Sequence, residues 1–278
     1  MKIVKTISEM KRIAKSWKAQ GYSIGLVSTM GYLHDGHKSL IKSAFENDRV
    51  IVSIFVNPMQ FYSKEEYESY PRDLQRDCNI CEECGVNIVF APEAGEMFEE
   101  GFCSYVDMYG LTENLCGMTR PNYFRSFCTV ITKLFNITTP DKAYFGQKDA
   151  QQLAIVKRLV RDLNLDIDII GCPVVREEDG LAITSKNIYL NAEERRSALI
   201  LSKTIRLAQG LVQAGEKDAE EIIRAMRENI ETEPLARIDY VEIVDANTLQ
   251  RVDTIEGQVL IAIAVYIGKT RLLDNFTT

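Results

Sequence analysis

The sequence has no apolar segment long enough to cross a lipid bilayer as a helix. Its longest apolar run extends from Val259 to Gly268, far short of the roughly 20 residues that a membrane-spanning helix needs. The first 20 residues mix charged and apolar side chains and lack the apolar block of a signal peptide. Their basic amphipathic pattern fits either a membrane-surface helix or a solvated first helix of the fold. We favour the second interpretation.

The chain also lacks an excess of positive charge. It has 33 Lys and Arg against 40 Asp and Glu, which gives a formal net charge of −7. Binding to nucleic acid needs clustered cations that displace condensed counterions. We therefore expect small-molecule substrates, and we expect neither a nucleic acid nor a membrane as a partner.

Seven cysteines, an odd number, stand in a chain without a secretory signal, which predicts reduced thiols in a cytoplasmic protein. Cys78, Cys81 and Cys84 follow a C-x2-C-x2-C pattern that can begin a zinc or iron–sulfur site. On the helix that we predict from Pro71 to Gly85, however, these thiols would spread over a wide arc. We expect packed or half-exposed cysteines and no structural metal.

Residues 24 to about 175 alternate strand-like apolar runs with helical patterns. Strands are predicted at 24–30, 49–56, 86–92, 141–146 and 166–175, and helices at about 35–47, 71–84, 121–136 and 148–163. This alternation is typical of a parallel sheet with crossover helices. The fold class that it predicts is α/β, with a Rossmann-like doubly wound parallel sheet.

The pattern changes after Asn187. Helical stretches at 191–214 and 217–230 precede short strands at 238–244 and 258–267. A chain of 278 residues is also longer than a typical single domain. We predict two domains, a Rossmann-like domain over 1–182 and a smaller C-terminal α+β domain over 183–278.

Both histidines of the chain lie in one tetrad, His34-Asp35-Gly36-His37, between the first of these strands and its helix. In a doubly wound sheet the ligand crevice lies at the carboxyl ends of the strands, where a helix N-terminus offers backbone N–H groups to phosphate. Two imidazoles there can donate hydrogen bonds to charge developing on a phosphoryl group. Gly36 would let a nucleotide approach the backbone. The tetrad is therefore the candidate catalytic centre.

The stretch from Ser28 to His37, STMGYLHDGH, resembles the H-x-G-H signature of the nucleotidyltransferase and class I aminoacyl-tRNA synthetase superfamily, in the version typical of the pantothenate synthetase family. Further segments resemble that family in the same order along almost the whole chain. They are 56–61 (VNPMQF), 70–72 (YPR), 115–117 (LCG), 143–153 (AYFGQKDAQQL), 179–182 (DGLA), 241–245 (VEIVD) and 270–275 (TRLLDN).

This resemblance implies an ATP-dependent ligase that forms pantothenate from pantoate and β-alanine through a pantoyl adenylate, releasing AMP and pyrophosphate. It implies ATP as co-substrate, Mg²⁺ bound through triphosphate oxygens and water, and a cytoplasmic homodimer. By the same resemblance, domain 1–182 binds ATP and pantoate, and domain 183–278 closes over the active site.

The resemblance also assigns roles to residues. His34, His37, Lys148 and Lys186 are the predicted catalytic groups, and Gln60 and Gln152 are predicted to hold pantoate, with Gln60 also near β-alanine. The predicted ATP-binding residues are Met30, Gly31, Tyr32, Leu33, His34, Asp35, Gly36, His37, Gly146, Gln147, Lys148, Asp149, Val175, Ile183, Thr184, Ser185 and Lys186. Lys148 also follows a predicted strand and begins a helix, a place where its ammonium can meet phosphate oxygens.

The chain departs from the common family pattern at six positions, namely Ser28, Tyr123, Gln147, Ile183, Thr184 and Lys186. Thr184 keeps a hydroxyl group and Lys186 keeps a positive charge, but lysine lacks the planar fork of the usual arginine. Gln147 replaces a glutamate, so no catalytic carboxylate is expected there.

Two other functions fit part of the pattern. A nucleotidyltransferase of the same superfamily would keep the nucleotide on its acceptor, and a nucleotide-binding regulator would have lost turnover. The histidine pair and the two lysines disfavour the regulator. A tRNA synthetase is disfavoured further, because the chain is acidic and has no evident anticodon-binding extension.

Overall fold

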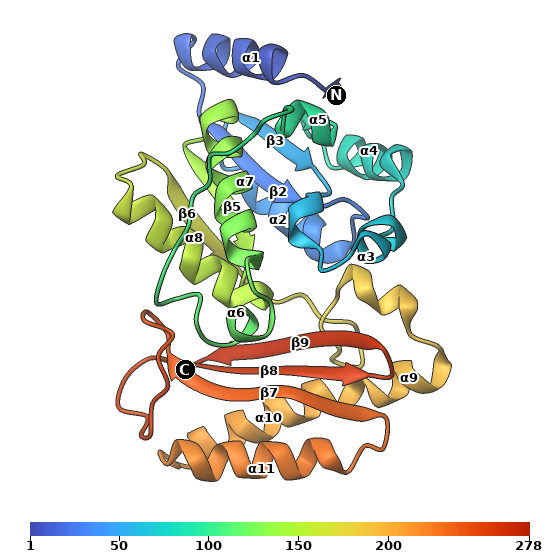
Figure 1. The fold of residues 1–278 in the computed structure, drawn as a ribbon, viewed down its shortest axis with the longest axis vertical. Helices are drawn as coiled ribbons and strands as arrows, with labels where there is room; N and C mark the ends of the chain where they lie inside the picture. The colour runs from blue at the N-terminus through green and yellow to red at the C-terminus, as the bar shows by residue number, and fades with distance from the viewer. The chain divides into compact units, whose positions relative to one another are not determined.

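The computed structural model describes residues 1–278, which form two compact units (Figure 1). Unit 1 comprises Met1–Tyr109, Thr119–Gln147 and Ile155–Pro173; unit 2 comprises Gly110–Met118, Lys148–Ala154 and Val174–Thr278. None of the helices has the length and apolar character that a membrane span requires.

Unit 1 is built on a six-stranded sheet in the order β1-β4-β3-β2-β5-β6, with every pairing parallel. Its strands are β1 (Lys2–Val4), β2 (Ile24–Thr29), β3 (Arg49–Ile54), β4 (Ile88–Phe90), β5 (Lys142–Gly146) and β6 (Asp168–Cys172). The chain order reverses between β2 and β5, so the crevice at their carboxyl ends is the topological switch point. The prediction of a doubly wound parallel sheet is confirmed.

Helices connect these strands. They are α1 (Ile7–Ala19), α2 (Asp35–Ala44), α3 (Lys64–Ser69), α4 (Leu74–Glu83), α5 (Ala94–Met97) and α7 (Tyr123–Thr138), together with the 3-10 helix η1 (Pro58–Gln60). The helix α8 (Ala150–Asp162) begins in unit 2 and ends in unit 1, after the 3-10 helix η2 (Gln147–Asp149).

The apolar strands of unit 1 are buried because helices cover the sheet. Leu40 and Ile41 of α2 share one core cluster with Val50 and Val52 of β3. Cys78 and Cys81 of α4 belong to the same cluster, and burial raises the pKa of Cys81 to about 12. These two thiols are therefore packing groups of the core.

The first helix is present as predicted and starts at a conventional cap. The Thr6 hydroxyl accepts a hydrogen bond from the backbone N–H of Glu9, as an N-cap residue does. Met10 and Ala14 are buried, so one side of α1 belongs to the core while the other is solvated. The short strand β1 before it was not predicted.

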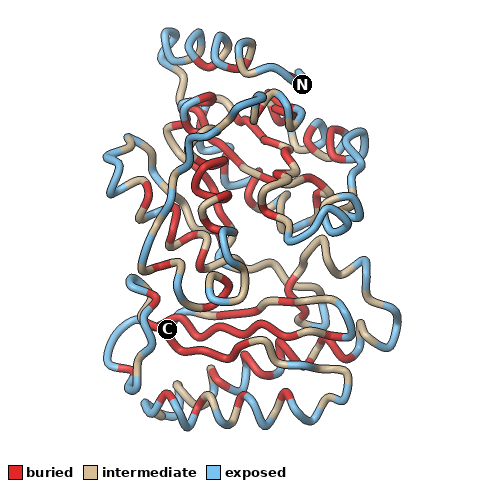
Figure 2. The backbone as a smooth tube through the Cα atoms, viewed as in Figure 1, coloured by how far each residue is buried: buried red, intermediate tan, exposed pale blue.

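Unit 2 contains a three-stranded antiparallel sheet in the order β7-β8-β9. Its strands are β7 (Ala236–Asp245), β8 (Val259–Ile267) and β9 (Thr270–Thr277), and its helices are α6 (Cys116–Thr119), α9 (Ala192–Ser197), α10 (Leu199–Gln213) and α11 (Ala219–Glu231), with the 3-10 helix η3 (Ser185–Tyr189). The central strand β8 is buried over most of its length, as Figure 2 shows. Helices α10 and α11 form the core of this unit with the sheet. The predicted smaller α+β part is thus present, with one strand, β9, that the pattern did not reveal.

Candidate functional site

The loop between β2 and α2 follows a left-handed path at the switch point. Gly31 has φ 82° and Tyr32 has φ 52°, a region that favours glycine. A Cβ atom at Gly31 would lie 3.1 Å from Oδ2 of Asp77 and 3.1 Å from Cγ2 of Ile54. The loop therefore needs glycine at position 31 both for its backbone conformation and for the space beside it.

Asp77 binds the backbone of this loop. Its carboxylate, in α4, accepts the backbone N–H groups of Tyr32 and Leu33 at 2.7 Å each. The side chain is 1% exposed, and burial raises its pKa, while the two N–H groups and Arg76 act in the opposite direction. Both of its oxygens are thus bound to the loop.

The two histidines form one compact pair at the start of α2. Their ring centroids are 4.0 Å apart with a 40° angle between the planes. The backbone N–H of His34 donates to Nδ1 of His37 at 3.2 Å. Since Nδ1 acts as an acceptor, the neutral ring of His37 carries its hydrogen on Nε2. His37 is thereby held as an Nε2–H donor at a helix N-terminus, where anions are favoured.

Gly36 has a role in this pair that the sequence did not reveal. A Cβ atom there would lie 2.9 Å from Cε1 and 3.0 Å from Nδ1 of His34. The absent side chain thus leaves room for the imidazole of His34, in addition to any room it leaves for a nucleotide.

Gln60 is buried, with 7% of its surface exposed. It ends η1, whose start is capped by Asn57, and its Oε1 accepts from Nδ2 of Asn57 at 3.0 Å. Its carbonyl accepts from the Arg120 guanidinium at 3.0 Å. Gln60 therefore has a fixed main chain and a fixed amide oxygen.

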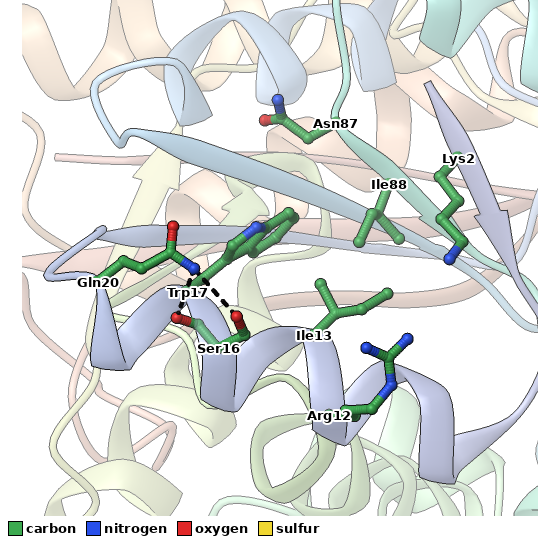
Figure 3. A pocket seen from close by; sticks show the side chains of 8 residues that line it. All are labelled: Lys2, Arg12, Ile13, Ser16, Trp17, Gln20, Asn87 and Ile88. Atoms are coloured by element: carbon green, nitrogen blue, oxygen red, sulfur yellow. Dashed lines mark hydrogen bonds between the residues drawn. The ribbon is translucent and has the colours of Figure 1, made fainter.

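A separate cavity of about 360 Å³ lies elsewhere in unit 1, beside α1 and the amino ends of β1 and β4 (Figure 3). It is lined by Lys2, Arg12, Ile13, Ser16, Trp17, Gln20, Asn87 and Ile88. None of these belongs to the predicted site. Lys2 is paired with Glu9 at 2.6 Å.

Unit 2 contains the second group of predicted residues. The Lys148 side chain is 16% exposed, and its ammonium lies 3.7 Å from the Asp149 carboxylate. Gln152 follows in α8 and is partly buried. The neighbouring Gln151, to which the sequence assigned no role, is 6% exposed. Its amide binds Cys116 N, Leu111 O and Asn114 O at 2.8–2.9 Å and so joins the start of α8 to the loop before α6.

The segment from Val175 to Lys186 folds back on itself within unit 2. The carbonyl of Val175 accepts the backbone N–H of Ile183 at 3.0 Å, which joins two predicted ATP-binding positions. Thr184 is the N-cap of η3 and accepts the N–H of Lys186 at 3.4 Å. The Lys186 ammonium donates to the carbonyl of Arg271 at 3.4 Å. The hydroxyl of Thr184 therefore caps the start of η3.

The predicted residues are divided between the two units. His34, His37, Gln60, Gly146 and Gln147 belong to unit 1, and Lys148, Asp149, Gln152, Val175 and 183–186 belong to unit 2. Sequence reasoning missed Asp77 as the support of the histidine loop and Gln151 as the support of α8. Both act through contacts with residues distant in sequence, which no local pattern signals.

The doubly wound sheet, with a paired-histidine tetrad at its switch point, defines a nucleotide-binding protein of the H-x-G-H class. The family model described as pantoate-beta-alanine ligase matches residues 2–277. The chain belongs to the pantoate–β-alanine ligase family, and it is a ligase.

Individual relatives agree with this assignment. The chain is 59% identical to a pantothenate synthetase of Ruminiclostridium cellulolyticum over 277 residues, covering 100% of this chain and 99% of the relative. The crystal structure of pantothenate synthetase from Thermus thermophilus matches with a TM-score of 0.93 and 39% identity, covering 99% of each chain. The pantoate-beta-alanine ligase of Francisella tularensis, complexed with beta-gamma ATP and β-alanine, matches with a TM-score of 0.81 and 34% identity, covering 99% of this chain and 97% of that one. Family membership supports the ligase over the nucleotidyltransferase and the inactive regulator.

Proposed function

We propose that this enzyme joins pantoate to β-alanine at the expense of ATP, through a pantoyl adenylate. A carboxylate oxygen of pantoate attacks the α-phosphorus of ATP, and the bond to pyrophosphate breaks. The amine of β-alanine then attacks the acyl carbon, loses a proton, and displaces AMP. The observation that carries this proposal is the histidine pair at the switch point of the parallel sheet, in a chain that belongs to the pantoate–β-alanine ligase family.

The histidine pair provides donors for the first step. Negative charge on the phosphoryl oxygens is redistributed as the α-phosphorus is attacked, and fixed donors that need no reorganisation stabilise it best. The contact between His34 N–H and Nδ1 of His37 leaves the Nε2–H of His37 as the donor. One well-placed donor of this kind contributes about 3 to 4 kcal/mol to the transition state.

Lys148 and Lys186 provide positive charge for the same ATP, with Lys148 placed in η2 and Lys186 in η3 of unit 2. The solved Francisella tularensis relative is complexed with beta-gamma ATP and β-alanine, which supports ATP as the co-substrate here. The remaining ATP-binding positions in 30–37, 146–149, 175 and 183–186 follow the same assignment.

Gln60 and Gln152 bind pantoate in this proposal, and Gln60 also borders β-alanine. An amide offers both a donor and an acceptor to an acid that bears hydroxyl and carboxylate groups. The fixed Oε1 of Gln60, which accepts from Asn57, favours the use of its NH2 group toward the substrate.

Mg²⁺ fits this chain as a companion of the triphosphate. No group of three or more His, Cys, Asp or Glu side chains is placed to hold a metal, and both oxygens of Asp77 bind backbone N–H groups. Phosphate oxygens and water would then supply most ligands, as Mg²⁺ commonly requires. Bound in that way, Mg²⁺ would neutralise phosphate charge.

We also propose that the enzyme is a cytoplasmic homodimer. Its functional domains are residues 1–182 and 183–278, and the second domain closes over the bound substrates.

The experiment that tests the function is ATP–pyrophosphate exchange with purified protein, with and without pantoate, followed by addition of β-alanine and measurement of AMP. We expect exchange only with pantoate, and AMP release on adding β-alanine. An exchange rate that is the same with and without pantoate would refute the assignment. His34→Ala and His37→Ala should each reduce exchange severely with unchanged folding, and near-normal exchange in both would remove the argument from the histidine pair.

A further inference from the structure

Strand β9 contacts three separate segments of unit 2 that carry predicted ATP-binding residues. It is the edge strand of the three-stranded sheet and pairs with β8 along its length. Its polar side chains Asp274 and Asn275 are 2% and 7% exposed. Buried polar groups are costly unless they are hydrogen-bonded. The hydrogen-bond partners of these two side chains therefore indicate their structural role.

Asn275 binds the main chain of Lys148. Its Nδ2 donates to the Lys148 carbonyl at 2.7 Å. That carbonyl belongs to the 3-10 helix η2, just before α8. The bond therefore fixes the backbone from which the Lys148 side chain extends.

Asp274 holds the segment that leads to Lys186. Its two oxygens bind the Arg176 guanidinium side by side, at 2.7 and 2.8 Å. Arg176 also donates to the Gly180 carbonyl at 3.1 Å and forms an antiparallel bridge with Ala182. A bidentate pair of this kind fixes orientation as well as distance.

The third contact is direct. The Lys186 ammonium donates to the Arg271 carbonyl at 3.4 Å. Arg271 is itself bound to the Asp239 carboxylate at 2.7 and 2.9 Å. Thus one short strand meets the main chain of Lys148, the base of the 175–183 turn and the side chain of Lys186.

We propose that β9 is the positioning strand for the phosphate-binding lysines, with Asn275 as the positioning residue of Lys148 and Asp274 as that of the turn leading to Lys186. The inference rests on the proposed function, because it assigns these contacts to the adenylation step. The Asn275 amide binds the Lys148 carbonyl and acts on the reaction through Lys148. A displacement of a reacting group by about 1 Å can lower a rate about 100-fold.

The test uses Asn275→Asp, which keeps the volume of the side chain but replaces the donor by a carboxylate that repels the Lys148 carbonyl. Asn275→Ala removes the amide without adding charge. The matched control for this second variant is Asn229→Ala, since Nδ2 of Asn229 donates to Oγ1 of Thr204 at 2.8 Å in the same unit, between α11 and α10. Thermal unfolding of each full-length variant separates loss of fold from loss of positioning.

We expect Asn275→Asp and Asn275→Ala to lower kcat for pantoate-dependent pyrophosphate exchange about 10- to 100-fold, and Asn229→Ala to leave kcat within about twofold. In a Lys148→Ala background, Asn275→Ala should have less than a threefold further effect, because residues that act through one another are not additive. The inference would be overturned if the losses of kcat in the two single variants of Asn275 and Lys148 multiplied in the double variant. Equal kcat values in the Asn275 and Asn229 variants would also overturn it. Wild-type protein that shows no exchange would instead overturn the proposed function itself, and this inference with it.

Discussion

The imidazole of His34 occupies the space that a side chain at Gly36 would need, with its nearest ring atoms 2.9 and 3.0 Å from the position of a Cβ. This contact explains the glycine between the two histidines by packing. The ring of His34 in turn lies 4.0 Å from that of His37, centroid to centroid. The space at position 36 therefore accommodates the His34 ring, which lies beside the ring of His37.

Gly36→Ala should lower adenylation while leaving the fold intact. Real Cβ contacts are almost never as short as 2.9 Å, so the His34 ring must shift, and we expect at least about a tenfold loss of exchange activity. The measurement is pantoate-dependent pyrophosphate exchange beside chemical unfolding.

The matched control is Gly210→Ala in α10, where a Cβ meets nothing within 4 Å. It should raise the free energy of unfolding by about 0.5 to 1 kcal/mol with unchanged exchange. If Gly36→Ala exchanges as fast as wild-type protein, the His34 ring does not depend on that space.

Asp77→Asn should destabilise the loop that carries the tetrad. An amide keeps one acceptor but presents an NH2 group to the backbone N–H of Tyr32 or Leu33, which now approach the carboxylate at 2.7 Å. A buried unsatisfied group costs about 1 to 3 kcal/mol. Urea unfolding measures this loss, and exchange activity should fall with it.

Asp73→Asn on the same helix is the control for that change. Asp73 caps α4 by accepting the N–H of Arg76 at 3.0 Å, and asparagine caps helices about as well as aspartate. Equal stability of the two variants would show that Asp77 does not support the loop.

The cysteines should differ sharply in reactivity. Cys103 is exposed, whereas Cys81 and Cys128 are buried, and burial raises the pKa of each of these two thiols to about 12. At pH 8 a thiol with such a pKa is ionised to only about one part in 10,000, and the thiolate is the nucleophile. Raising the pH from 7 to 9 should therefore leave both unreactive.

Iodoacetamide labelling followed by peptide mass spectrometry checks this order. In folded protein at pH 8 we expect modification of Cys103 and none of Cys81 or Cys128, with all three modified after unfolding in urea. Labelling of Cys81 as fast as Cys103 in folded protein would contradict its place in the core.

Much of the α/β architecture could be predicted because β2, β3 and β8 are nearly continuous apolar runs, which only a covered sheet explains. The histidine tetrad could be placed because it follows such a strand after a short loop. Strand β9 could not be predicted, because Asp274 and Asn275 interrupt the apolar pattern. Their partners Arg176 and Lys148 lie 98 and 127 positions away in sequence, and a local pattern carries no information about them. Asp77 is a similar case, 44 positions from Leu33.

The adenylate itself is tested most directly by isotope transfer from pantoate. Pantoate labelled with ¹⁸O in its carboxylate is incubated with ATP, β-alanine and the enzyme, and AMP and pyrophosphate are analysed by mass spectrometry. Attack of the carboxylate on the α-phosphorus predicts one ¹⁸O atom in each AMP and none in pyrophosphate. Unlabelled AMP, or label in another phosphate product, would contradict a pantoyl adenylate.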